Sequence, residues 1–132
     1  MTRAFADTNI LVYRFSADPF KCDRAKTLIA SSPHVSVQVL NELANVARRK
    51  MGLAWAEIGE ITAAMEANCT VEPVTIHTHR LALELAASHP FGWYDACLLA
   101  SALLADCRTF WSEDMQDGLR IRGLQIRNPF RA

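Results

Sequence analysis

The stretch TRAFADTNILVYRF, residues 2–15, places a single carboxylate, Asp7, between two apolar segments. Burying a carboxylate costs free energy unless a partner compensates it, so Asp7 requires a structural or a functional explanation. The segment before it, residues 3–6, predicts a short β-strand, and residues 9–15 predict a helix that leaves this strand. The same order, a strand followed by a helix, recurs along the rest of the chain.

Further helices and strands are predicted from hydrophobic spacing and from the positions of Pro33, Gly52 and Pro90, which mark helix ends. We predict helices over residues 21–30, 38–51, 55–67, 77–89 and 94–106, strands over residues 34–37, 70–74 and 107–111, and an edge strand or extended tail over residues 119–129. This alternation predicts a single α/β domain over residues 1–132, with helices flanking a central, mainly parallel sheet as an α/β/α sandwich.

The composition is that of a globular protein, with 51% hydrophobic and 21% charged residues in a chain of 132. The 14 basic residues balance the 14 acidic ones, which argues against coating of nucleic acid by bulk charge. The apolar runs are shorter than the roughly 18 residues of a membrane span, so we expect a cytoplasmic protein that does not contact a membrane. The four cysteines form no CxxC pair, and we expect buried free thiols in a reducing compartment.

Two acidic residues follow predicted strands. Asp7 comes directly after residues 3–6, and Asp114 follows residues 107–111 by a short turn. In a parallel sheet the carboxyl ends of the strands lie along one edge, where ligands bind. We therefore expect Asp7 and Asp114 to lie at the same edge.

Two more acidic residues are expected to reach this edge from helices. Glu42 falls on the flank of an apolar arc, early in the helix over residues 38–51. Asp95 begins the buried stripe of the helix over residues 94–106, which continues at helical spacing through Leu98, Leu99, Ala102 and Leu103. Acids from four distant segments are thus predicted to converge.

Converging carboxylates repel one another unless they hold a proton or a cation. Oxygen ligands without a matching histidine or cysteine set favour Mg²⁺ or Mn²⁺ over Zn²⁺. Such an ion lowers the pKa of bound water and neutralises charge on a phosphoryl group, which are the requirements of phosphodiester hydrolysis.

Each acid also has an ordinary structural explanation. Asp7 could cap the helix that follows it, and Asp95 could interact with its helix dipole. Glu42 could pair with Arg49 two turns away, and Asp114 could occupy a turn. Because these separate explanations do not require the acids to meet, their predicted convergence favours a metal site.

Four segments, ADTNILVY, VLNELANV, WYDACLLASA and WSEDMQDG, resemble in their order and spacing the PIN-domain family of ribonucleases, and in particular the VapC-type toxins of toxin–antitoxin pairs. The resemblance spans nearly the whole chain. It implies an α/β/α domain, acids that hold Mg²⁺ or Mn²⁺, and endonucleolytic cleavage of RNA. It also implies a homodimer and a cognate antitoxin protein whose C-terminal segment blocks the site.

Carried over by motif, the metal-site and catalytic acids are Asp7, Glu42, Asp95 and Asp114. The resemblance also implies that Thr8 and Ser112 orient these acids and that Asn9 orients Asp7. Asp117 is the second choice after Asp114 for the last ligand, whereas Glu113 is expected to point outward.

Other motifs have competing explanations. The basic run at residues 48–50 could bind phosphates, but such a run at a helix end is more often a solvated face that complements the helix dipole, which is the favoured explanation. His77 and His79 do not share a helix face and are expected to be ordinary histidines. Trp93 and Tyr94 could stack on bases beside Asp95, or form core or subunit contacts.

We therefore expect a Mg²⁺- or Mn²⁺-dependent endoribonuclease of the toxin type. The alternative is a catalytically inactive PIN-fold module that binds RNA or protein, although concentrated negative charge opposes phosphate binding. A metal-dependent phosphatase or a phospho-acceptor domain using Asp7 is less favoured, because a second Asp two residues later is missing.

Overall fold

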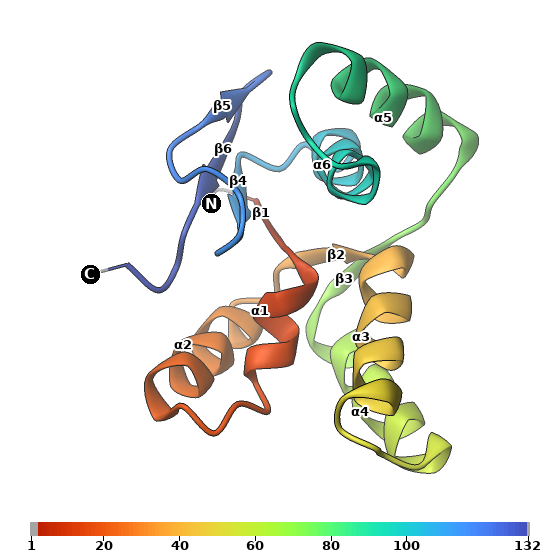
Figure 1. Ribbon diagram of the computed structural model, residues 1–132, viewed down its shortest axis with the longest axis vertical. Helices are drawn as coiled ribbons and strands as arrows, with labels where there is room; N and C mark the ends of the chain where they lie inside the picture. The colour runs from red at the N-terminus through yellow and green to blue at the C-terminus, as the bar shows by residue number, and fades with distance from the viewer. Residues whose placement is uncertain (1–2, 132) are drawn as a thin grey trace.

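The computed structural model describes residues 3–131, drawn in Figure 1. Its strands are β1 (Ala4–Ala6), β2 (His34–Ser36), β3 (Thr70–Glu72), β4 (Thr109–Trp111), β5 (Arg120–Ile121) and β6 (Leu124–Arg127). Its helices are α1 (Thr8–Tyr13), α2 (Pro19–Ala30), α3 (Val37–Arg49), α4 (Trp55–Asn68), α5 (Ile76–Ser88) and α6 (Trp93–Leu104). The predicted helices and strands are present with small shifts at their ends. For example, α2 begins at Pro19, with Asp18 as its N-cap.

The six strands form one sheet in the order β3-β2-β1-β4-β6-β5. All neighbouring pairs are parallel except β5 and β6, which are antiparallel. The chain moves from β1 outward through β2 to β3, and then returns past β1 to β4. Because parallel crossovers are right-handed, α1–α4 lie on one face of the sheet and α5 and α6 on the other, as Figure 1 shows. The predicted α/β architecture with a mainly parallel sheet is confirmed.

Residues 119–129 differ from the prediction of one edge strand or tail. They form a hairpin in which Arg122 and Gly123 both have positive φ, of 48° and 88°, as a tight two-residue turn requires. β6 pairs with β4 inside the sheet, and β5 alone of these two strands lies at an edge. Leu124 and Ile126 are fully buried by this pairing, which explains why the segment is not a tail.

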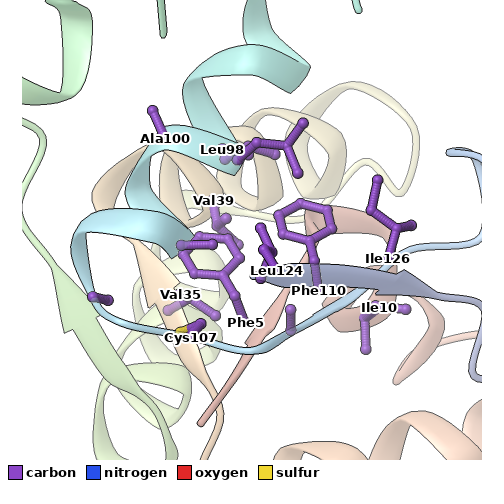
Figure 2. Close-up of a cluster of buried hydrophobic side chains, with 14 of the residues drawn as sticks. Phe5, Ile10, Val35, Val39, Leu98, Ala100, Cys107, Phe110, Leu124 and Ile126 are labelled. Atoms are coloured by element: carbon purple, nitrogen blue, oxygen red, sulfur yellow. The ribbon is translucent and has the colours of Figure 1, made fainter. Parts of the chain in front are cut away.

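The core is centred on two aromatic rings from neighbouring strands. Phe5 of β1 and Phe110 of β4 are paired in register, and their ring centroids stack 5.4 Å apart. Figure 2 shows both rings on the side of the sheet where Leu98 of α6 lies. Both side chains are fully buried, so this contact joins β1 and β4, the two strands whose ends carry Asp7 and Asp114.

Replacing Phe110 with alanine is expected to lower the free energy of unfolding by about 3–5 kcal/mol, because it removes a buried ring and leaves a cavity. Urea denaturation of both proteins measures the difference. The matched control is Phe20→Ala, since Phe20 is 58% exposed and its loss is expected to cost less than about 1 kcal/mol. Equal losses in the two variants would contradict this description of the core.

The cysteines are all free thiols, as predicted. Only Cys107 is fully buried, however, whereas Cys22, Cys69 and Cys97 are half-buried, so the prediction of buried thiols is correct for one of them. Within residues 3–131, every helix is too short or too polar to cross a membrane.

Candidate functional site

The site lies where the chain reverses its direction across the sheet. From β1 the chain proceeds to β2, whereas β4, on the other side of β1, is reached from the opposite face through α5 and α6. In open parallel sheets a crevice forms at the carboxyl ends of two such strands, because the connections that follow them diverge. Asp7 follows β1 at this point, and Ser112 follows β4.

Asp7 is held by hydrogen bonds to both of its carboxylate oxygens. The Thr8 backbone N–H donates to Oδ1 at 2.6 Å, so Asp7 does cap α1, and the Ser112 hydroxyl donates to Oδ2 at 3.0 Å. Burial nevertheless raises the pKa of Asp7 to about 6, aided by the nearby charges of Asp95 and Asp114 and opposed by these two hydrogen bonds. A cap alone does not require this cost, because exposed acids cap helices equally well.

Ser112 fixes the loop that follows β4. Its side chain is fully buried, and its oxygen accepts hydrogen bonds from the backbone N–H groups of Asp114 and Met115 at 3.2 and 3.3 Å. Since the same hydroxyl donates to Asp7, one side chain couples the carboxyl ends of β1 and β4. This contact matches the orienting role that the sequence suggested for Ser112.

Asp114, in the loop after β4, and Asp95, in α6, line the same cavity. Asp114 is exposed and accepts a hydrogen bond from the Asn9 side-chain amide at 2.5 Å. Asn9 was expected to orient Asp7, and the structure shows that it contacts Asp114 instead. Asp95 is in the first turn of α6, where partial burial and the charge of Asp114 raise its pKa. Burial is the larger cause in both cases, and the charges of Asp95 and Asp114 on Asp7, and of Asp114 on Asp95, add to it.

Glu42 reaches the site from α3. Its Oε1 accepts a hydrogen bond from the Thr8 hydroxyl at 3.0 Å, which links α3 to the first turn of α1. The alternative explanation of Glu42, an ion pair with Arg49, is absent from the ion pairs formed within residues 3–131. Thr8 thus has the orienting contact that the sequence suggested for it.

These contacts bring all four predicted acids to one cavity of about 280 Å³. It is lined by Asp7, Thr8, Asn9, Glu42, Asn45, Val46, Asp95, Leu98 and Asp114. Asn45, which the sequence analysis did not single out, is exposed and also lines this cavity. The available signal was its helical spacing, since Asn45 lies three residues after Glu42 and so shares its side of α3.

Two other acids of the last motif lie outside the cavity. Asp117 accepts a hydrogen bond from the Asn128 backbone N–H at 2.8 Å and lies 3.6 Å from the Arg131 guanidinium, so it ties down the C-terminal segment. The structure therefore does not place Asp117 with the other acids. Glu113 accepts from the Tyr13 hydroxyl and pairs with Lys21 at 2.9 Å, which lowers its pKa; as expected, it points away from the site.

A family model, the PIN domain, matches residues 4–117. The chain belongs to the PIN-domain family. The matched range contains β1, β4 and all four acids of the cavity. A comparison with curated proteins gave no match.

Several solved structures share the fold of this PIN domain. One is a toxin–antitoxin complex from Klebsiella pneumoniae, with a TM-score of 0.73 and 20% identity over 96% of this chain and 97% of the other. A DNA-bound VapBC complex from Salmonella typhimurium has a TM-score of 0.70 and 22% identity over 98% and 99%. VapC20 from Mycobacterium tuberculosis, described as a toxin that cleaves the sarcin–ricin loop, has a TM-score of 0.64 and 23% identity over 84% and 91%. At these identities the likeness establishes the fold.

The chemistry of this PIN domain's cavity fits a hard divalent cation. Its acidic groups are all carboxylates, and histidine and cysteine are absent from its lining. Within residues 3–131, however, no three His, Cys, Asp or Glu side chains are close enough together to hold an ion. Carboxylate oxygens are thus suitable ligands for such a cation, but the acids would have to move closer together than they lie here in order to bind it.

Proposed function

We propose that this PIN domain is a divalent-metal-dependent endoribonuclease and the toxin of a type II toxin–antitoxin pair. The observation that carries the proposal is the convergence of Asp7, Glu42, Asp95 and Asp114, from four separate segments, on one cavity at the carboxyl edge of the sheet. The raised pKa of Asp7 and Asp95 supports it, because burial and neighbouring carboxylates both disfavour the charged form, a cost that a bound cation or proton offsets.

The residues of the cavity have separable roles in this proposal. Mg²⁺ or Mn²⁺, held by the four acids, would supply an activated water and neutralise charge on the RNA phosphate. Ser112 holds Asp7 in place by its 3.0 Å hydrogen bond, and Thr8 fixes one oxygen of Glu42 at 3.0 Å. Asn9 holds Asp114 in the same way. These neutral donors orient the carboxylates without cancelling their charge, so the acids remain available to a cation.

The proposed partners follow from the relatives of similar fold. The Klebsiella and Salmonella structures are toxin–antitoxin complexes, which supports a cognate antitoxin protein for this chain. The description of VapC20 as an RNA-cleaving toxin supports RNA as the substrate. A homodimer and a cytoplasmic location belong to the same proposal.

The experiment that tests the proposal is cleavage of an end-labelled pool of cellular RNA by the purified protein, free of antitoxin. Discrete products in Mg²⁺ or Mn²⁺, and none in EDTA, are expected. Products that persist unchanged in EDTA would contradict metal dependence. Intact RNA in every lane, from protein shown to be folded, would contradict the nuclease.

One observation favours a second candidate, a PIN-fold module that binds RNA without cutting it. The acids are spaced too widely in this structure to hold an ion as they stand. This candidate predicts RNA binding without products and a melting temperature that does not respond to divalent cations.

If the acids bind a cation, Mg²⁺ or Mn²⁺ raises the melting temperature by roughly 10 °C at about 100 times its Kd, because the ion binds only the folded state. Differential scanning fluorimetry at constant ionic strength measures this shift. Asp95→Asn is the variant in which the shift should disappear. A shift of equal size in that variant would place the bound ion elsewhere.

A further inference from the structure

A second groove adjoins the carboxylate cavity. It has a volume of about 330 Å³ and is lined by Gln38, Asn41, Glu42 and Asn45 of α3 and by Tyr94 of α6. Glu42 and Asn45 line both hollows, so the groove continues directly from the cavity. A polymer whose phosphate lay among the acids would place a neighbouring unit in this groove.

Tyr94 offers an unoccupied aromatic face in the groove. Its side chain is 69% exposed, whereas the neighbouring Trp93 packs edge-on against His79 at a centroid distance of 5.4 Å. Within residues 3–131, Tyr94 forms no comparable aromatic or cation–π pair. Its backbone is nevertheless anchored, because the Gln38 amide donates to the Tyr94 carbonyl at 3.3 Å. The backbone that carries the ring is therefore fixed at the groove, and the ring is exposed there.

The other side of the groove carries three amide side chains, those of Gln38, Asn41 and Asn45. An amide presents a donor and an acceptor, which is the pattern that pairs with the edges of nucleobases, although the Gln38 amide also donates to the Tyr94 carbonyl. Among residues 3–131, the charged side chain that lines the groove is the Glu42 carboxylate, and neither lysine nor arginine contributes to it, so its chemistry does not favour a phosphate. An aromatic face beside neutral amides matches the way proteins bind unpaired bases of RNA.

We propose that this groove binds an unpaired base next to the cleaved phosphate, with Tyr94 stacked on the base and the amides of α3 contacting its edge. The proposal rests on the proposed ribonuclease function and adds where its sequence preference arises. It makes Tyr94 and Asn41 determinants of specificity, distinct from the acids that hold the cation.

The test uses a short RNA that contains a cleavage site mapped with the wild-type protein. Tyr94→Ala is expected to lower kcat/KM by roughly tenfold to a hundredfold, the usual effect of losing one stacked base. Tyr94→Phe should retain most activity, because it keeps the aromatic face. Trp55→Ala is the matched control, since Trp55 is 65% exposed but lies outside both hollows.

Substrates lacking one base at a time identify the base that Tyr94 contacts. At one position beside the cleaved bond, removing the base should lower the wild-type rate as much as Tyr94→Ala does. The combination of that substrate with Tyr94→Ala should cost no more than either change alone, because both remove the same contact. Losses that multiply at every position would overturn the proposal.

If the wild-type protein cuts no RNA, the nuclease proposal fails and the groove is tested by binding. Fluorescence anisotropy of a labelled, short RNA of mixed sequence then compares the wild type with Tyr94→Ala and Trp55→Ala. Weaker binding by Tyr94→Ala alone supports the groove as a base site. Equal binding by all three proteins overturns it, as does an effect of Tyr94→Ala confined to the oligomeric state in sedimentation.

Discussion

Asp95→Asn is expected to abolish RNA cleavage, lowering the rate by roughly a thousandfold or more, while the protein stays folded. Asp95 lines the cavity, and its carboxylate takes part in none of the hydrogen bonds or ion pairs formed within residues 3–131. Its pKa is raised by partial burial and by Asp114, so the charge costs free energy in the absence of a cation. Asparagine removes that charge and leaves the packing beneath it, at Leu98 and Leu99, unchanged.

The matched control is Asp117→Asn. Asp117 belongs to the same motif as Asp114 but lies outside the cavity, where it accepts a hydrogen bond from Asn128. An asparagine carbonyl can accept that bond, so this variant should cleave RNA at close to the wild-type rate. Circular dichroism verifies that both variants are folded. Loss of cleavage in Asp117→Asn with full cleavage in Asp95→Asn would exchange the roles of the two acids.

The second large effect concerns the pH dependence of stability: the burial of Asp7 lowers the free energy of unfolding as the pH rises, the opposite of the effect of an acid stabilised by an ion pair. The pKa of Asp7 is about 6 in the folded protein, against an ordinary value of 3.8. Between these values the folded state binds more protons than the unfolded state, so stability falls as the pH rises from about 4 to about 6. Above about pH 6, in the protein without a cation, the buried charge of Asp7 lowers the free energy of unfolding by about 3 kcal/mol. Below about pH 4 this contribution vanishes, because both states hold the proton.

Urea denaturation in EDTA at a series of pH values measures this effect. Asp7→Asn should be more stable than the wild type by up to about 3 kcal/mol near pH 7, with the difference shrinking toward pH 4. An asparagine at this position can still accept the Thr8 hydrogen bond that caps α1. Parallel stability curves for the two proteins would show that Asp7 is not the group responsible.

Much of the fold followed from local patterns. The helices were predictable because their apolar residues recur at helical spacing, and the parallel sheet because strands and helices alternate. The hairpin of β5 and β6 was not predictable in this way. The pairing of β6 with β4 joins segments distant in sequence, and its burial of Leu124 and Ile126 depends on packing that no local pattern records.

The candidate site, too, was predictable in part from local patterns and in part only from the tertiary structure. The positions of Asp7 and Asp114 after strands, and the helical phase of Glu42 and Asp95, were enough to predict that the four acids lie together, and they line one cavity. Their role as ligands stays a prediction. Only the tertiary structure decided which neutral side chains hold three of the acids: Ser112 for Asp7, Thr8 for Glu42 and Asn9 for Asp114.

The same holds for Asp117, which the sequence left as the second choice after Asp114 for the last ligand. The loop after β4 has no periodicity, so its side-chain directions depend on what the fold places around them. There the buried Ser112 hydroxyl accepts the Asp114 N–H, and the C-terminal segment offers Asn128 to Asp117. The sequence by itself determined which segments carry acids to the edge of the sheet. The tertiary structure decided which acids face the cavity, because that choice depends on contacts between residues far apart in the chain.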